Sequence, residues 1–185
     1  GDGRGAARRQ GDAGGGARSA RDAARGAAHR RESAAQMADA VLGQAGEHDA
    51  VIMSAAVADY RPVATVASKL KKDTLGAAPT LTLQPTLDIL GELGRRRGDE
   101  ARPVLVGFAA ETNDVEAHAA RKLRQKRCDL VVANDVSEPG SGFGTETNRV
   151  TLLSGEPAQV ERLPQLTKIE VADRILDRLL VLLGP

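Results

Sequence analysis

The stretch that decides the fold is DAVIMSAAVADYRP, residues 49–62. Its first ten residues, 49–58, form a nearly continuous apolar run, which is typical of a strand covered on both faces in a parallel sheet. The run ends abruptly at polar residues that include Asp59 and Arg61. Ligands of such sheets bind outside the carboxyl ends of the strands. The polar end of this stretch is therefore a candidate site.

Working outward, two more apolar runs predict buried strands at 103–110 and 128–135, and both end in polar residues. We predict a polar connection over 59–78, an alternating strand at 80–83 and a hairpin formed by 149–154 and 159–163. The spacing of apolar side chains predicts helices at 33–46, 87–97, 113–126 and 167–182.

Two of these helices have capping-box patterns, Asn113-x-x-Glu116 and Thr167-x-x-Glu170. Strands that alternate with helices indicate an α/β fold. We predict a Rossmann-like, three-layer, doubly wound and mostly parallel sheet that is incomplete at its N-terminal side. The predicted hairpin is a small extension of that sheet.

The composition is that of one ordinary domain of 185 residues with 41% hydrophobic and only 2% aromatic residues. The core must therefore consist of Val, Leu, Ile and Ala. The single cysteine, Cys128, excludes an internal disulfide and fits a reducing compartment; in its apolar strand we expect a buried, inert thiol. No apolar run approaches the roughly 20 residues of a membrane span, and no secretory signal is evident. We expect a cytoplasmic protein.

Residues 1–31 differ from the rest, because Arg, Gly and Ala supply 8, 8 and 9 of the 31 positions. Eight Arg and three Asp give this segment a net charge of +5. With so little apolar surface to bury, we expect it to be disordered and the domain to occupy 32–185. We hypothesise that the segment is an out-of-frame reading of GC-rich DNA, which sequencing upstream and through codon 32 would test. Nucleic-acid binding is an alternative that the lack of aromatic residues disfavours.

Six sequence blocks together carry a family resemblance. In chain order they are AAVADYRP (55–62), KLKK (69–72), GFAAET (107–112), A-x-K-x3-K (120–126), DLVVANDV (129–136) and TK-x3-A-x-x-IL (167–176). The series resembles phosphopantothenoylcysteine synthetase, the phosphopantothenate–cysteine ligase of coenzyme A biosynthesis, over about residues 33–181. In many bacteria this enzyme is the C-terminal half of a fusion with a flavin-dependent decarboxylase.

The resemblance implies the reaction and its participants. The family uses CTP, with Mg²⁺ or a similar divalent cation, to activate the carboxylate of 4′-phosphopantothenate as an acyl-cytidylate. The amine of cysteine then displaces CMP and forms an amide. The resemblance also implies a homodimer, with the 149–163 hairpin as a candidate contributor, and no flavin in this part of the fusion. It identifies no metal ligands.

The resemblance also implies site residues. Ala55 and Asp59 match positions that contact the nucleotide, and Lys69 matches a lysine that supports cytidylate formation. The remaining matches lie near the cytidine, near the phosphates or at a strand end: Leu87, Asp88, Ile89, Leu90 and Phe108 for the base and its pocket, Lys122 and Lys126 for the phosphates, and Asn134 and Asp135 for the strand end. The family usually has proline where this chain has Leu87, so the φ angle there is not fixed.

Each residue also has a plain interpretation. Asp59 and Arg61 could form a surface ion pair, and the lysines of 69–72 could belong to a solvated loop. Lys122 and Lys126 could lie on the wet face of a helix, and Phe108 in the core. His48 and His118 have no partner at metal-ligand spacing, so we expect both at the surface.

Part of the family pattern is missing from this sequence: the first strand, its Gly/Thr-rich turn and an Asn-Ser-Ser-Gly segment whose asparagine carries the acyl-cytidylate to product. We therefore expect poor stability, because a sheet without a strand has unpaired backbone groups, and weak or absent ligase activity. The alternative function is a non-catalytic nucleotide-binding fragment. A nicotinamide-binding Rossmann protein is disfavoured, since no G-x-G-x-x-G follows a strand.

Overall fold

The computed structural model describes residues 31–66, 68–71, 73, 78–141 and 144–184. The chain divides into Gly1–Arg31 and Glu32–Pro185, and the second unit contains every element that follows. The expected disorder of residues 1–31 concerns positions that, apart from Arg31, lie outside the described residues. Lys72 of the lysine cluster also lies outside them.

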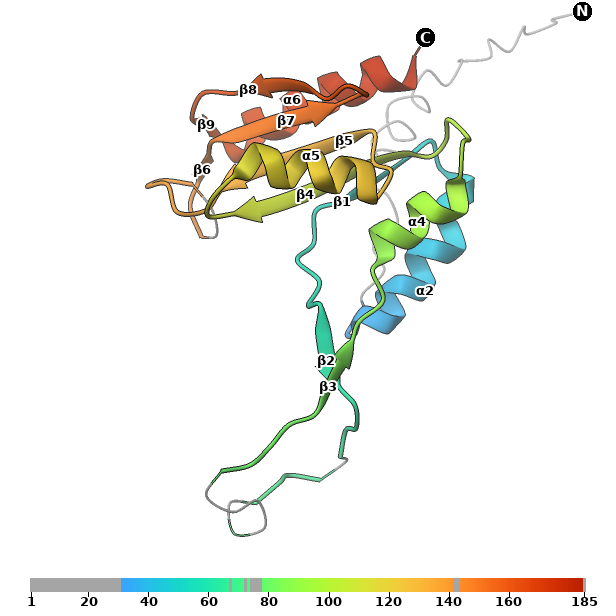
Figure 1. Ribbon diagram of the computed structural model, residues 1–185, viewed down its shortest axis with the longest axis vertical. Helices are drawn as coiled ribbons and strands as arrows, with labels where there is room; N and C mark the ends of the chain where they lie inside the picture. The colour runs from blue at the N-terminus through green and yellow to red at the C-terminus, as the bar shows by residue number, and fades with distance from the viewer. Residues whose placement is uncertain (1–30, 67, 72, 74–77, 142–143, 185) are drawn as a thin grey trace, which may run out of the picture. The chain divides into compact units, whose positions relative to one another are not determined.

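A five-stranded sheet forms the centre of the domain, in the order β1-β4-β5-β7-β8 (Figure 1). The strands are β1 Ala50–Met53, β4 Val104–Glu111, β5 Leu130–Asp135, β7 Val150–Ser154 and β8 Gln159–Arg162. The first three are parallel, and the β7–β8 hairpin continues the sheet in the antiparallel sense. This arrangement confirms the predicted α/β fold with a hairpin extension.

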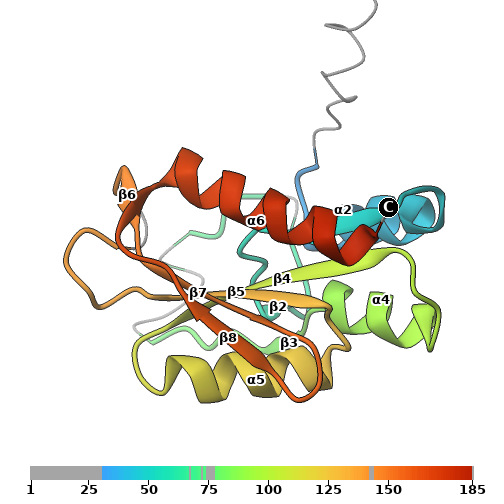
Figure 2. The ribbon, with the colours of Figure 1, turned by 90° about the horizontal axis from the view of Figure 1, so that it is seen from above.

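Helices cover both faces of this sheet (Figure 2). They are α2 Ala34–Gln44, followed by the 3-10 turn η1 Ala45–Glu47, and then α4 Ile89–Arg97, α5 Val115–Gln125 and α6 Lys168–Leu183. One core cluster contains α2, α4 and α5 residues, and a second contains the α6 stripe Val171, Ile175 and Leu179. The largest fully buried side chains are Leu and Val, as the low aromatic content predicted.

The predicted strand at 49–58 is only partly correct. β1 ends at Met53, and its only neighbour in the described sheet is β4. It therefore lies at an edge, where Ile52 is 41% exposed, and the prediction of a strand buried on both faces is wrong. An apolar run indicates that a strand can be buried on both faces. Whether it is buried depends on which other segments of the protein pack against it.

The segment after β1 leaves the sheet and forms a two-stranded ribbon. β2 Tyr60–Pro62 pairs antiparallel with β3 Leu83–Pro85, and Val63 N–H donates to Thr82 O at 3.0 Å. Figure 1 shows this ribbon projecting away from the sheet. The predictions of a polar connection over 59–78 and of a strand at 80–83 are therefore wrong in part. Backbone pairing between distant segments created strands where the local pattern showed none.

Helix caps were predicted with mixed success. The Thr167–Glu170 capping box of α6 is present, and Ser33 and Gln36 form another at α2. The box predicted at Asn113 is wrong. The N-cap of α5 is Asp114, in a left-handed conformation with φ 45° and no side-chain cap. A second small ribbon, β6 Thr147–Asn148 with β9 Leu166–Thr167, leads into α6.

Arg97 closes the amino edge of the sheet. Its side chain is 8% exposed and donates to Pro103 O at 3.0 Å, to Arg127 O at 2.6 Å and to the Asp129 carboxylate. The same carboxylate accepts the Leu105 N–H at 2.7 Å. The end of α4 is thereby tied to the beginnings of β4 and β5.

Within the described part of the chain, no helix has the length and apolar character needed to cross a bilayer.

Candidate functional site

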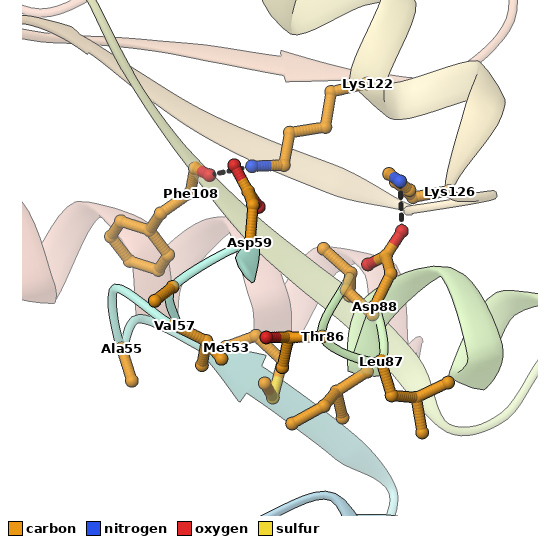
Figure 3. A pocket seen from close by; sticks show the side chains of 13 residues that line it. Met53, Ala55, Val57, Asp59, Thr86, Leu87, Asp88, Phe108, Lys122 and Lys126 are labelled. Carbon is orange, nitrogen blue, oxygen red and sulfur yellow. Dashed lines mark hydrogen bonds and ion pairs between the residues drawn. The ribbon is translucent and has the colours of Figure 1, made fainter. Parts of the chain in front are cut away.

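A cavity of about 390 Å³ lies at the carboxyl edge of the sheet (Figure 3). It is formed by the end of β1 and the segment after it, and by the turn before α4 together with the first residues of that helix. One side chain from β4 and two from the α5 side complete the lining. The lining residues are Met53, Ala55, Val57, Ala58, Asp59, Thr86, Leu87, Asp88, Ile89, Leu90, Phe108, Lys122 and Lys126. Segments far apart in sequence thus meet where the topology brings strand ends together.

Two backbone segments form adjacent walls of the cavity and are joined directly. The Thr86 N–H donates to Asp59 O at 2.7 Å, so the segment after β1 is held against the turn that precedes α4. Figure 3 shows the Phe108 ring turned toward Ala55 and Val57. The side chains on this side of the cavity are apolar, which suits the face of an aromatic base.

The side of the cavity next to Phe108 carries charge. Lys122 and Lys126 lie one turn apart on α5, so both side chains reach the same edge of the sheet. The Lys122 ammonium donates to the backbone oxygen of Phe108, and the Lys126 ammonium pairs with Asp88. Figure 3 places Asp59 and Lys122 on the same side of the cavity. The two ammonium groups make this side suitable for oxyanions.

Asp88 begins α4 at the wall of the cavity. Its Oδ1 accepts the Gly91 N–H at 3.0 Å as the N-cap of the helix. Burial raises the pKa of this carboxyl, but the hydrogen bonds from Lys126 and Gly91 and the charges of Lys126 and Lys122 outweigh burial, so the pKa is lowered. Asp88 is therefore ionised at neutral pH.

The floor of the cavity depends on a close approach between α4 and β4. A Cβ at Gly107 would lie 2.7 Å from Leu90 Cδ2 and 3.4 Å from Cys128 Sγ. Glycine thus lets Leu90 pack directly on β4 beneath the cavity. Burial raises the pKa of the Cys128 thiol to about 12, which confirms the predicted buried, inert thiol.

The family of the chain is shown by comparison with known proteins. The model of the family described as DNA/pantothenate metabolism flavoprotein C-terminal domain matches residues 16–182. The chain belongs to this family. The match begins upstream of residue 33, where the sequence blocks first indicated the resemblance.

Relatives and solved structures agree with this assignment. The coenzyme A biosynthesis bifunctional protein CoaBC of Vibrio vulnificus strain YJ016 is 45% identical over 150 residues, which are 80% of this chain and 36% of that protein. The CoaBC of Bacillus subtilis strain 168 is 44% identical over 146 residues, 79% of this chain and 34% of that protein. The chain therefore spans about a third of the length of these relatives.

Among solved structures, the C-terminal domain of a coenzyme A biosynthesis bifunctional protein CoaBC aligns with a TM-score of 0.61 and 37% identity, covering 81% of this chain and 62% of that one. The DNA/pantothenate metabolism flavoprotein from Streptococcus pneumoniae aligns with a TM-score of 0.63 at 22% identity, covering 84% of this chain and 71% of that one. The second match shows a shared fold alone.

Within this family's fold, the cavity gathers most of the residues singled out in the sequence. Nine of the ten proposed nucleotide-binding residues line it; the tenth, Lys69, lies between β2 and β3 and is not among the described lining residues. Sequence reasoning missed Met53, Val57, Ala58 and Thr86. Each lies within two residues of a position that was singled out, so adjacency was the available signal.

The two strand-end residues of β5 are engaged elsewhere. The Asn134 amide donates to Asn148 Oδ1 at 3.4 Å, and Asp135 Oδ1 accepts the Ser137 N–H at 2.8 Å together with the Ser137 hydroxyl. Neither residue is among the described cavity lining. Both organise the loop that follows β5, and a direct role in the site stays a prediction.

Several plain interpretations can now be judged. Lys122 and Lys126 face a cavity and each meets an acceptor, so they are not a simple wet helix face. The expectation of a surface His118 is only partly correct: its Nδ1 lies 2.9 Å from Glu111 Oε2, and both side chains are about three-quarters buried. Among the described residues, no group of three or more His, Cys, Asp or Glu could hold a metal ion by itself.

Proposed function

We propose that this chain is the nucleotide-binding part of a CTP-dependent phosphopantothenate–cysteine ligase of coenzyme A biosynthesis. The observation that carries the proposal is the cavity at the carboxyl edge. In a chain of this family, it brings an apolar wall and two lysines together from segments separated by up to about 70 residues. Such a combination suits a nucleotide, whose base is flat and apolar and whose phosphates are anionic.

The chemistry has two steps. A carboxylate oxygen of 4′-phosphopantothenate attacks the α-phosphorus of CTP, and pyrophosphate leaves. The amine of cysteine then attacks the acyl carbon of the cytidylate, CMP leaves with the acyl oxygen, and the nitrogen loses a proton to solvent. Both steps build negative charge on phosphate oxygens, which positively charged side chains stabilise.

The residues divide the work by their positions. We assign the cytidine to the apolar lining formed by Phe108, Ala55, Leu87, Ile89 and Leu90, whereas Asp88 within the same stretch meets Lys126 on the phosphate side. We assign the phosphates to Lys122 and Lys126, whose ammonium groups lie at the charged side. Lys69 keeps its proposed role in cytidylate formation. In that role it would act from the segment between β2 and β3.

Magnesium fits this cavity as a companion of the nucleotide. Mg²⁺ is typically held by one or two carboxylates together with substrate phosphates. Asp59 lines the cavity and makes no ion pair with any described residue, so its carboxylate is the candidate protein ligand. The ion would neutralise part of the triphosphate charge during cytidylate formation.

The proposed partners follow from the relatives, which are bifunctional proteins of which this chain spans about a third. We propose a flavin-dependent decarboxylase domain as the partner in the intact fusion, with no flavin bound by this chain. We also propose a homodimer in the cytoplasm. The β7–β8 hairpin, the candidate contributor to the dimer, lies at the outer edge of the sheet.

Two measurements test the proposal. Isothermal titration with CTP and Mg²⁺ should show saturable binding that UTP reproduces less well. A coupled assay with CTP, 4′-phosphopantothenate and cysteine should then follow pyrophosphate release and amide formation. An absence of CTP binding would refute the proposal.

The second candidate function is nucleotide binding without ligation. It is favoured by the position of Lys69 outside the described cavity lining. Saturable CTP binding with no pyrophosphate release would establish it. Turnover at the rate of an intact relative measured alongside would exclude it.

A further inference from the structure

The side chain of Lys126 follows a defined course along α4. At its start, a Cβ on Gly94 would overlap the backbone oxygen of Lys126. In the middle, a Cβ on Gly91 would lie 3.3 Å from Lys126 Cδ. At its end, the ammonium meets the Asp88 carboxylate. Positions 88, 91 and 94 succeed one another on one helix face, so glycines leave the space in which this side chain reaches the cavity.

Asp88 uses its two oxygens for two different tasks. Oδ1 accepts the Gly91 N–H and caps α4, whereas Oδ2 meets the Lys126 ammonium. A Cβ on Gly91 would also lie 2.5 Å from Oδ2, so residue 91 must be small for the ion pair to form. Capping requires only an oxygen acceptor, and asparagine caps as well as aspartate. The negative charge of Asp88 is therefore surplus to the cap and acts on Lys126.

The two lysines of the cavity consequently differ in whether a carboxylate neutralises their positive charge. Lys122 donates to a neutral backbone oxygen, that of Phe108, and keeps its full positive charge for a ligand. Lys126 is paired with a carboxylate that is itself half-exposed in the cavity wall. An entering phosphate must compete with the Asp88 ion pair for Lys126, whereas Lys122 forms no ion pair with any described carboxylate and interacts with Asp88 only at longer range.

We propose that Asp88 is a positioning residue: a displaceable counter-ion that holds Lys126 at the cavity wall and yields it to a phosphate oxyanion. The inference rests on the proposed nucleotide-binding function and names the part of the nucleotide that Asp88 controls. The carboxylate keeps the ammonium extended in the empty cavity and weakens phosphate binding, so that a phosphorylated product can leave.

The test is isothermal titration of the full chain with CMP and with cytidine, at constant pH and ionic strength. The variants are Asp88→Asn, which keeps the cap, Lys126→Met and the double variant. Asp88→Asn should tighten CMP binding about three- to tenfold and leave cytidine binding within about twofold. In the Lys126→Met background the same change should alter CMP binding by less than about twofold.

Glu92→Gln is the matched control. Glu92 lies one turn further along α4 and pairs with Arg95 and Arg96 outside the cavity. Its substitution also removes one carboxylate and frees cations, and it should leave CMP binding unchanged. An equal gain in CMP affinity in Glu92→Gln would show that any lost carboxylate near the site has this effect, and it would overturn the inference.

Other outcomes separate the inference from the proposed function. Weaker binding of both CMP and cytidine to Asp88→Asn would show that Asp88 contacts the nucleoside and would overturn the counter-ion role. An equal gain with and without Lys126 would show direct repulsion instead of positioning. If the unsubstituted chain binds no CMP, the proposed function fails and the inference fails with it.

Discussion

The two edges of the sheet differ in how fully their positively charged side chains are hydrogen-bonded within the protein. At the amino edge, Arg97 is 8% exposed and its guanidinium bonds to two backbone oxygens and to Asp129, which also accepts a backbone N–H. At the carboxyl edge, Lys122 and Lys126 each have one acceptor among the described residues, although an ammonium can donate three hydrogen bonds. Apart from the buried Arg97 Nε, which has no hydrogen-bond partner among the described residues, the first cluster is closed, and the second is open.

This difference teaches how a fold separates stability from binding. A buried cation must have its partners within the protein, because desolvation without compensation is costly. A cation intended for a ligand must keep donors available and remain at a solvent-filled cavity. α4 joins the two edges, with Asp88 before its first turn and Arg97 in its last. One helix therefore serves both purposes through its two ends.

The largest expected effect is at the amino edge. Arg97→Ala should lower the free energy of unfolding by about 3–5 kcal/mol, since it leaves the Asp129 carboxylate and two backbone oxygens without their donor. Urea denaturation of the full chain measures the change. Arg96→Ala is the control, because Arg96 is half-exposed and should change stability by less than about 1 kcal/mol. Equal losses for the two variants would contradict the closed cluster.

The next effect is at the carboxyl edge and concerns binding. Lys122→Met should weaken CTP binding by about 10- to 100-fold, because a charged hydrogen bond contributes roughly 1.5–3 kcal/mol. Its free energy of unfolding should change by less than about 1 kcal/mol. Titration and urea denaturation of the same preparation measure both. The comparison of edges breaks if Lys122→Met destabilises the chain as much as Arg97→Ala does.

A smaller effect sharpens the description of the amino edge. Asp129→Asn keeps an oxygen that can accept the Leu105 N–H but removes the charge opposite Arg97. We expect a loss of about 1–1.5 kcal/mol in the free energy of unfolding, less than for Arg97→Ala, because the backbone oxygens still hold the guanidinium. Urea denaturation measures it. A loss equal to that of Arg97→Ala would assign the whole cluster to the ion pair.

The smallest effect is the pH dependence due to Asp88. Its folded-state pKa is lowered below 3.8, so ionised Asp88 stabilises the fold above the unfolded-state pKa, and this contribution is lost as pH falls through the folded-state pKa. Because the side chain is half-exposed, we expect less than about 1 kcal/mol. Urea midpoints of the unsubstituted chain and Asp88→Asn, compared from pH 5 to pH 2.5, should converge in acid. A constant difference would show that the charge of Asp88 does not matter to stability.

Local patterns predicted much of the fold, for identifiable reasons. The apolar runs at 103–110 and 128–135 became the central strands β4 and β5, since both have neighbours on two sides in the described sheet. The Thr167 capping box needs only residues three apart, and it formed. The strand at 49–58 was overestimated, and β2 was missed, because strand pairing depends on segments elsewhere in the chain.

The site shows the same division. The residue types and blocks singled out Asp88, Phe108, Lys122 and Lys126 before any geometry was known. Their acceptors were not predictable: the partner of Lys126 lies 38 positions away and that of Lys122 is a backbone oxygen 14 positions away. The pairing of His118 with Glu111 was missed because its seven-residue spacing crosses from a strand to a helix.

The sequence by itself determined the alternation of strands and helices, the aliphatic core and the chemical types at the strand ends, because these depend on side-chain polarity and on periods of two and 3.6 residues. Only the tertiary structure decided which strand lies at an edge, which cation is closed by partners and which is open. Those properties depend on burial and on hydrogen bonds between distant segments, and α4 acquires its two roles only when β4, β5 and α5 lie beside it.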